Sequence, residues 1–376
     1  MVAMLKQWIC PLLLLLVSFG ATAACDWPAW QQFKQDYISD AGRVIDPSSP
    51  QKITTSEGQS YGLFFALVAN DRETFDRLLT WTENNLAAGD LTAHLPAWLW
   101  GQHRQNNWDI LDPNSASDSD LWIAYDLLEA GRLWHSRRYQ TMGTLLLQRI
   151  AKEEVVNIPG LGEMLLPGKI GFHDEDRWRL NPSYLPPQLL ARFSSMAGPW
   201  KAMVDVNQRM WLETAPHGFS PDWVVWQTGK GWQPDETKPN IGSYDAIRTY
   251  LWAGMLSNNS PQKAALIQRF QPMAAATQQQ GLPPETTNAL TGKTQGEGPV
   301  GFSAALLPLL TSSPAPFNRL TFNQQQQRVQ DAPPDKEAYF SAVLTLFGQG
   351  WTQQRYRFNR LGELQPAWGS QCVTSK

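Results

Sequence analysis

Three carboxylate residues stand in similar settings, each shortly after a serine and at the start of a segment with helical periodicity. They are Glu57 after Ser56, Asp118 after Ser117, and Asp245 two positions after Ser243. A serine at such a position is a good helix N-cap, and a carboxylate in the first turn interacts favourably with the helix dipole. A structural role therefore explains any one of these carboxylates taken alone.

The residues around the three carboxylates indicate chemistry in addition to capping. The three segments are Glu57-Gly58-Gln59-Ser60-Tyr61-Gly62, Ala116-Ser117-Asp118-Ser119-Asp120 and Tyr244-Asp245-Ala246-Ile247-Arg248. Small neighbours leave room for a ligand beside a carboxylate, while aromatic rings and an arginine can hold that ligand. The three segments are therefore candidates for one binding cleft.

Two carboxyl groups that face one cleft can hydrolyse a glycosidic bond. One group protonates the leaving oxygen, and the other activates water or attacks the sugar, once their surroundings separate their pKa values. A helix start favours the charged form, which suits a base at Asp245 but opposes an acid at Glu57. Glu57 would need burial or a nearby negative charge to stay protonated. The residues alone thus predict a glycosidase and leave the roles open.

Composition narrows the class of ligand. The net charge of −3 offers no basic excess to neutralise phosphates, which argues against nucleic acid or an acidic membrane surface as partner. The 18 tryptophans should mostly be core, but many adjoin Pro, Gly or polar residues, where flat rings could stack on sugars. The five histidines form no HExxH or similar cluster. We therefore predict a carbohydrate ligand, no metal and no cofactor.

The first 24 residues have the layout of a signal peptide. Lys6 precedes an apolar run over 11–19, which is too short to span a bilayer, and small residues fill 21–24. A catalytic domain over 25–376 should then lie in the periplasm or be secreted, with no membrane insertion after signal removal. A lipoprotein is the alternative, because Cys25 follows directly. Cys25 and Cys372 are expected to pair, although two free thiols remain an alternative.

Helical periodicity dominates the chain, and no linker or shift in charge divides it. Helices are predicted over 57–69, 72–86, 118–133, 138–151, 184–193, 200–212, 244–256, 261–278, 302–310 and 336–346. Alternating strands are scarce, 224–226 being the best candidate, and mobile loops are predicted over 278–298 and 323–334. These patterns favour one all-α domain built from helix pairs.

The same segments resemble glycoside hydrolase family 8. The run 116–120, followed by Ile123-Ala124, Leu127-Leu128, Ala130 and Trp134, is similar to the family signature, with departures at Ser119 and Asp126. The run 56–62 resembles the segment that carries the family's proton donor. The run 244–248 resembles the segment that carries the base of inverting members. The resemblance extends over 27–368.

This resemblance implies an (α/α)6 barrel with an open groove, and hydrolysis of internal β-1,4 bonds with inversion. Glu57 would be the general acid and Asp245 the general base. Asp118 would hold and distort the sugar, the alternative being a nucleophile. The remaining candidate substrate-binding residues are Tyr184, Tyr244 and Arg248 around that sugar, and Trp98, Trp100 and Trp178 as stacking platforms.

Within the family, the likeness is strongest to periplasmic members encoded alongside bacterial cellulose synthases. The runs 181–184, 219–223 and 347–351 carry it. It implies a β-1,4-glucan chain such as cellulose as substrate, a role in cellulose biosynthesis, and the cellulose synthase export complex as a candidate partner. Two alternatives stay open, namely a hydrolase of chitosan or xylan and a non-catalytic glucan-binding protein.

Overall fold

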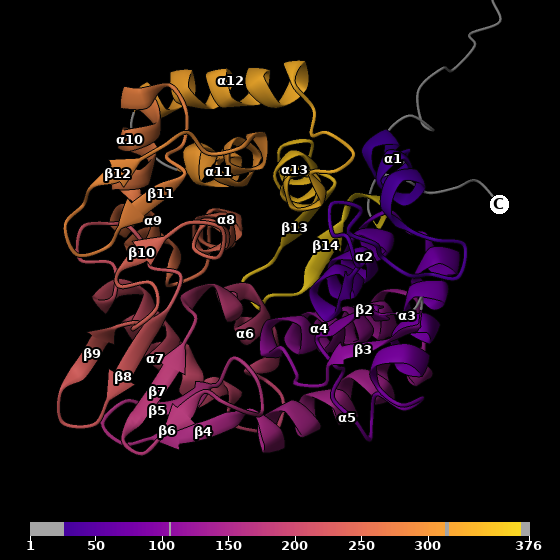
Figure 1. Cartoon of the computed structure of the whole chain (residues 1–376). Helices are drawn as coiled ribbons and strands as arrows, with labels where there is room; N and C mark the ends of the chain where they lie inside the picture. Colours follow the sequence, from indigo (N-terminus) through magenta and orange to yellow (C-terminus); the bar gives the residue numbers. More distant parts are fainter. Residues whose placement is uncertain (1–25, 105–106, 313–315, 370–376) are drawn as a thin grey trace, which may run out of the picture.

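A computed structural model describes residues 26–104, 107–312 and 316–369. The predicted signal peptide over 1–24 and both cysteines of the predicted disulfide, Cys25 and Cys372, lie outside these residues. Within them the chain is mostly helical, and the helices form an inner ring and an outer layer (Figure 1). None of the helices in these three ranges is long and apolar enough to cross a lipid bilayer.

The inner ring consists of helices that are buried along most of their length. They are α2 Ser56–Val68, α4 Ser117–Leu133, α6 Pro187–Phe193, α8 Ile247–Met255, α11 Val300–Ser312 and α13 Tyr339–Thr352. Each contacts the next in this order. Phe347 of α13 closes the ring onto α2, with ring centroids 5.4 Å from Phe64 and 4.7 Å from Phe65.

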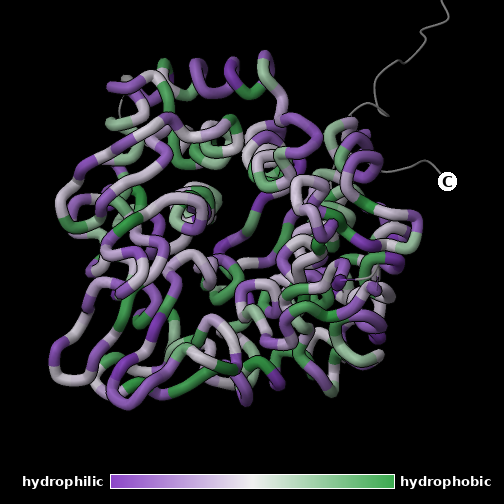
Figure 2. The backbone as a smooth tube through the Cα atoms, in the orientation of Figure 1, coloured by the Kyte–Doolittle hydropathy of each residue, from purple (hydrophilic) through white to green (hydrophobic). Residues whose placement is uncertain are grey.

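The outer helices pack on the ring with one apolar side. They are α1 Pro28–Tyr37, α3 Arg72–Leu86, α5 Arg137–Glu153, α7 Trp200–Glu213, α9 Lys263–Arg269, α10 Gln271–Gln280 and α12 Pro316–Asp331. Figure 2 shows mainly hydrophilic residues along α12 at the periphery. The pairs α2–α3, α4–α5, α6–α7, α8–α9, α11–α12 and α13–α1 are in contact. The predicted (α/α)6 barrel is confirmed.

Short antiparallel strands join many of the helices. They form five sheets: β1 Thr54–Thr55, β2 Leu99–Gln102 and β3 Trp108–Asp112; β4 Val155–Ile158 and β5 Gly162–Leu165; β6 His173–Asp174, β7 Arg177–Leu180, β8 Val224–Gln227 and β9 Gly231–Pro234; β10 Ile241–Gly242, β11 Thr286–Asn288 and β12 Thr294–Gln295; β13 Tyr356–Phe358 and β14 Leu364–Pro366. The strand expected over 224–226 is confirmed as part of β8. The prediction of a loop over 323–334 is wrong, because α12 continues to Asp331. The segment 278–298, also predicted to be a loop, contains the short strands β11 and β12.

Aromatic rings from four ring helices fill the centre of the barrel. The Trp122 ring lies 5.4 Å from Trp252 and 5.8 Å from Phe347, and Tyr61 lies 5.1 Å from Phe347. These side chains are at most 1% exposed. Much of the unusual tryptophan content is therefore core, as expected.

Trp122→Ala should lower the free energy of unfolding by about 3–5 kcal/mol, because it opens a cavity where α2, α4, α8 and α13 meet. The matched control is Trp108→Ala, since Trp108 is 43% exposed and should lose about 1 kcal/mol or less. Urea unfolding with equal m-values for both variants measures the difference. Equal losses would contradict a barrel centred on Trp122.

Candidate active site

The starts of α2 and α4 place two of the three predicted carboxylates. Glu57 and Asp118 lie in the first turns of these helices, as predicted, although each helix begins one residue earlier than expected, at Ser56 and Ser117. The predicted serine caps are wrong. The hydroxyl of Thr55 accepts the Gly58 N–H at 3.0 Å at the start of α2, and Ala116 at the start of α4 provides no side-chain cap. Asp118 Oδ1 accepts the neighbouring Ser119 N–H at 2.8 Å, and Oδ2 accepts from Arg248 at 3.3 Å.

The third carboxylate lies in a turn and not in a helix. The helix predicted from Tyr244 begins only at Ile247, so Asp245 precedes α8 by two residues. The Ile247 N–H donates to the Ser243 carbonyl at 3.0 Å, which closes the turn. The prediction of a helix start at Asp245 is therefore corrected to a pre-helical turn.

Arg248 joins all three carboxylates. Its Nη1 donates to Glu57 Oε2 and, at 3.3 Å, to Asp118 Oδ2, while its Nη2 donates to Asp245 Oδ1 at 2.7 Å. The guanidinium is 3% exposed, against 24%, 5% and 27% for the three acid side chains. In the described part of the chain, no group of three or more His, Cys, Asp or Glu side chains could hold a metal ion. The cation among the carboxylates is this arginine.

The surroundings of Glu57 favour its protonated form. Burial raises the pKa of Glu57 to about 7, and the negative charges of Asp118 and Asp245 add to this rise, while Arg248 opposes it. Burial is also the largest cause of the raised pKa of Asp118. The helix dipole that opposed an acid at Glu57 is thus outweighed, by the burial and neighbouring charges that the sequence could not show.

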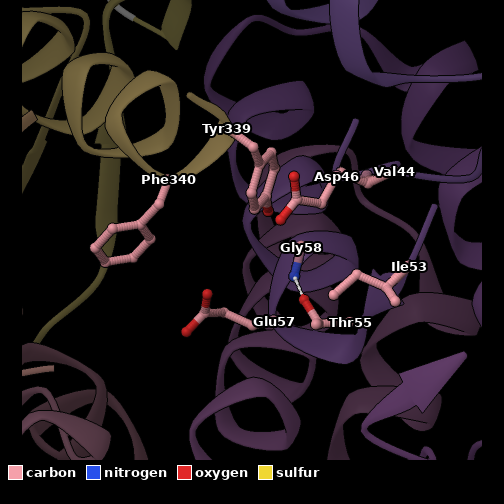
Figure 3. A pocket seen from close by; sticks show the side chains of 8 residues that line it. All are labelled: Val44, Asp46, Ile53, Thr55, Glu57, Gly58, Tyr339 and Phe340. Carbon is pink, nitrogen blue, oxygen red and sulfur yellow. Dashed lines mark hydrogen bonds between the residues drawn. The ribbon is translucent and has the colours of Figure 1, made fainter. Parts of the chain in front are cut away.

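A cavity of about 170 Å³ adjoins Glu57. It is lined by Val44, Asp46, Ile53, Thr55, Glu57, Gly58, Tyr339 and Phe340. Figure 3 shows the Glu57 carboxyl group extending from α2 into the space facing Phe340 of α13. The acid therefore stands at the boundary between the buried arginine and open space, where a ligand can reach it.

The predicted tyrosines lie with the carboxylates. The Arg248 guanidinium carbon is 5.7 Å from the centre of the Tyr184 ring. Tyr244 is 47% exposed, and its hydroxyl donates to Glu285 at 3.0 Å. The structure thus places Tyr184 against Arg248, and exposes Tyr244 next to Asp245.

The three predicted stacking tryptophans lie in different environments. The Trp98 carbonyl accepts the Ser56 N–H at 3.0 Å, which puts Trp98 beside the start of α2. The Trp100 ring is stacked 5.4 Å from Trp108 and lies 4.4 Å from the Arg43 guanidinium. Trp178 is 7% exposed and stacks on His173 at 4.6 Å. Trp100 and Trp178 are therefore largely covered by other side chains.

Two features of the site were missed from sequence. The Tyr61 hydroxyl accepts from Arg248 Nη1 at 3.2 Å, and its position four residues after Glu57 on one helix was the available signal. Asp120 and Glu154 form a buried carboxyl pair near Asp118. Burial raises the pKa of Asp120 and raises that of Glu154 to about 8, so the pair holds a proton near neutral pH. No local pattern links residues 120 and 154.

Comparison with known proteins identifies the family to which a chain with this site belongs. The family described as glycosyl hydrolases family 8 matches residues 3–354. The chain belongs to that family. This family 8 glycoside hydrolase is 57% identical over 376 residues to an endoglucanase of Salmonella typhi, covering all of both chains. It is 58% identical over 363 residues to an endoglucanase of Escherichia coli (strain K12), covering 96% of this chain and 97% of the relative.

A solved structure supports the same assignment. The endo-1,4-D-glucanase from Vibrio fischeri ES114 superposes on this family 8 hydrolase with a TM-score of 0.87 at 49% identity, covering 91% of this chain and 99% of the other.

Proposed function

We propose that this enzyme is an endo-1,4-β-glucanase that cleaves internal bonds of cellulose with inversion at the anomeric carbon. The observation that carries the proposal is the binding of Glu57 and Asp245 to different nitrogens of one buried guanidinium, with the pKa of Glu57 raised to about 7. Burial thereby keeps Glu57 as an acid, while the same arginine holds Asp245 through its other terminal nitrogen. The names of the relatives, endoglucanases at 57% and 58% identity, support a glucan substrate.

The proposed reaction uses the two outer carboxyl groups. Glu57 donates its proton to the leaving glycosidic oxygen as the bond from the anomeric carbon breaks. Asp245 removes a proton from a water molecule, whose oxygen bonds to the anomeric carbon from the opposite side. Such a water needs room, so with glucan bound we expect the two carboxyl groups ~6.5–9.5 Å apart. Asp118 and Tyr184 would hold the distorted sugar between them.

We further propose an exported enzyme with a signal peptide over 1–24 and a catalytic domain over 25–376. The apolar run and small residues of 1–24 support export. The likeness to members encoded with cellulose synthases supports a place in the periplasm, beside the cellulose export complex. Cell fractionation and co-purification with that complex test the two statements separately.

The product first released from cellopentaose should be the α anomer. Direct attack of water inverts the β configuration, whereas a covalent intermediate would restore it. Proton NMR within the first minutes, before mutarotation, measures the ratio of anomers. A β product would overturn Asp245 as base and would make Asp118 the candidate nucleophile.

A substrate panel tests the polymer. Carboxymethylcellulose should lose viscosity early, with few reducing ends released, because internal bonds are cut. Faster release of reducing ends from xylan or chitosan would replace cellulose as the substrate. No release from any of the three would leave only a glucan-binding protein.

A further inference from the structure

Asp222 holds the turn that carries Asp245. It is 1% exposed and lies in the loop before β8. Its Oδ1 accepts two backbone hydrogen bonds, from the Ser243 N–H at 2.7 Å and the Ala246 N–H at 2.8 Å. These two amides flank Tyr244 and Asp245. A single carboxylate oxygen therefore fixes both ends of the four-residue turn.

The turn needs such a support because it lies outside the regular helix. Glu57 and Asp118 belong to the first turns of α2 and α4, whereas Asp245 precedes α8. Behind the turn, a Cβ on Gly242 would come within 2.0 Å of the Ser220 carbonyl oxygen. The backbone is therefore packed tightly on that side. On another side, the Ser243 hydroxyl donates to the Glu285 carbonyl at 2.7 Å.

The second oxygen of Asp222, Oδ2, does not hold the turn and has only a distant charged partner. Lys238 Nζ lies 4.0 Å from Oδ2, at the long limit of an ion pair, and its side chain is 57% exposed. Burial raises the pKa of Asp222, and the Asp245 charge raises it further, while the two backbone hydrogen bonds oppose the rise. An amide at position 222 could keep the accepting oxygen without the charge.

We propose that Asp222 is a positioning residue for the general base, acting only through the placement of Asp245. The inference rests on the proposed function, because it requires Asp245 to activate water. A base displaced by about 1 Å is expected to cost ~10²-fold in rate. The side chain of Asp222 binds Ser243, Ala246 and Lys238 and not the Glu57, Asp118 or Arg248 side chains, so its loss should spare the acid and the binding of the sugar.

Asp222→Ala should lower kcat on cellopentaose by ~10–100-fold, with KM changed less than about threefold. Asp222→Asn should restore kcat to within about threefold of wild type, because the amide oxygen still accepts both N–H groups. On 2,4-dinitrophenyl β-cellotrioside, whose leaving group needs no proton, Asp222→Ala should lose as much as on cellopentaose. A defect on the acid side would be relieved by this substrate.

A double variant separates positioning from a general effect on the fold. With Asp245 already replaced by Ala, adding Asp222→Ala should change the residual rate on the activated substrate less than about twofold. The control is Asp71→Ala, since Asp71 Oδ1 also accepts a backbone N–H, from Thr74 at 3.1 Å, but at the start of the outer helix α3. This control should lose stability and keep kcat.

The positioning role would be overturned if Asp222→Ala lowered the residual rate of Asp245→Ala as strongly as it lowers the wild-type rate. Failure of Asp222→Asn to restore kcat would also overturn it. So would a wild-type rate for Asp222→Ala. The anomer released by the wild-type enzyme tests the proposed function separately, so the two can fail independently.

Discussion

Glu57→Gln is expected to lower kcat on cellopentaose by ~10²–10⁴-fold, while the dissociation constant stays within about threefold. The amide keeps the shape of the side chain and an oxygen that can accept from Arg248 Nη1. It cannot deliver the proton that the leaving oxygen needs. Activity on 2,4-dinitrophenyl β-cellotrioside should largely survive, because that leaving group departs as an anion. Isothermal titration with cellopentaose and steady-state kinetics measure both parts.

The pH dependence of the wild-type enzyme follows from the same residue. Glu57 acts in its protonated form, and burial raises its pKa to about 7. Activity that depends on this proton should be retained up to neutral pH and should then fall about tenfold per unit. With the activated substrate this alkaline fall should disappear. An alkaline fall beginning near pH 4.5, the ordinary value for Glu, would contradict Glu57 as the buried acid.

The control for Glu57→Gln is Glu163→Gln. Glu163 lies on β5 and accepts from Asn157 at 3.1 Å, remote from Arg248 in the sequence and absent from its contacts. We expect it to keep wild-type kcat and the same pH profile. Loss of cellopentaose binding by Glu57→Gln would indicate that Glu57 holds the sugar instead of protonating it.

Asp245→Asn is expected to cause a second loss of ~10²–10⁴-fold in kcat, for a different reason. The water loses its base, so the activated substrate should be slowed as much as cellopentaose. Removing the Asp245 charge also removes one cause of the raised pKa of Glu57. The residual alkaline fall should therefore move to lower pH.

Chemical rescue distinguishes the two roles. Azide added to Asp245→Ala should restore turnover of the activated substrate and yield an inverted glycosyl azide, because the small anion replaces the activated water. Azide should give no such rescue in Glu57→Gln. Rescue that yields the retained configuration would show that Asp245 does not serve as the base.

The sequence was sufficient to predict most of the helices and those site residues that lie at helix starts. Helices α2 and α4 are long and rich in apolar residues, which predicted them as helices, and their first turns carry Glu57 and Asp118 as predicted. The short strands other than β8 were missed, since runs of two to five residues hold too little alternation to be distinguished from loops. Trp178 was a candidate stacking platform, but pairing with Trp226 of β8 and stacking on His173 bury it.

The features of the site that could not be predicted depend on contacts between segments distant in the sequence. The raised pKa of Glu57 depends on Asp118 and Asp245, which are remote in sequence. Asp222 was part of a run noted only for its likeness to relatives, and its hydrogen bonds to residues 243 and 246 span more than twenty positions. Such a partner has no local signature.

The large sequence separation between Arg248 and its carboxylate partners affects when the enzyme becomes active during folding. Its partners Glu57 and Asp118 lie 191 and 130 positions earlier in the chain. Closing loops of that length costs entropy before any contact compensates for it, so these pairs should form late, when the ring of helices closes. Until then Arg248 is a solvated cation and Glu57 an ordinary acid of low pKa. Recovery of activity during refolding should therefore follow burial of the central tryptophans, without an earlier active intermediate.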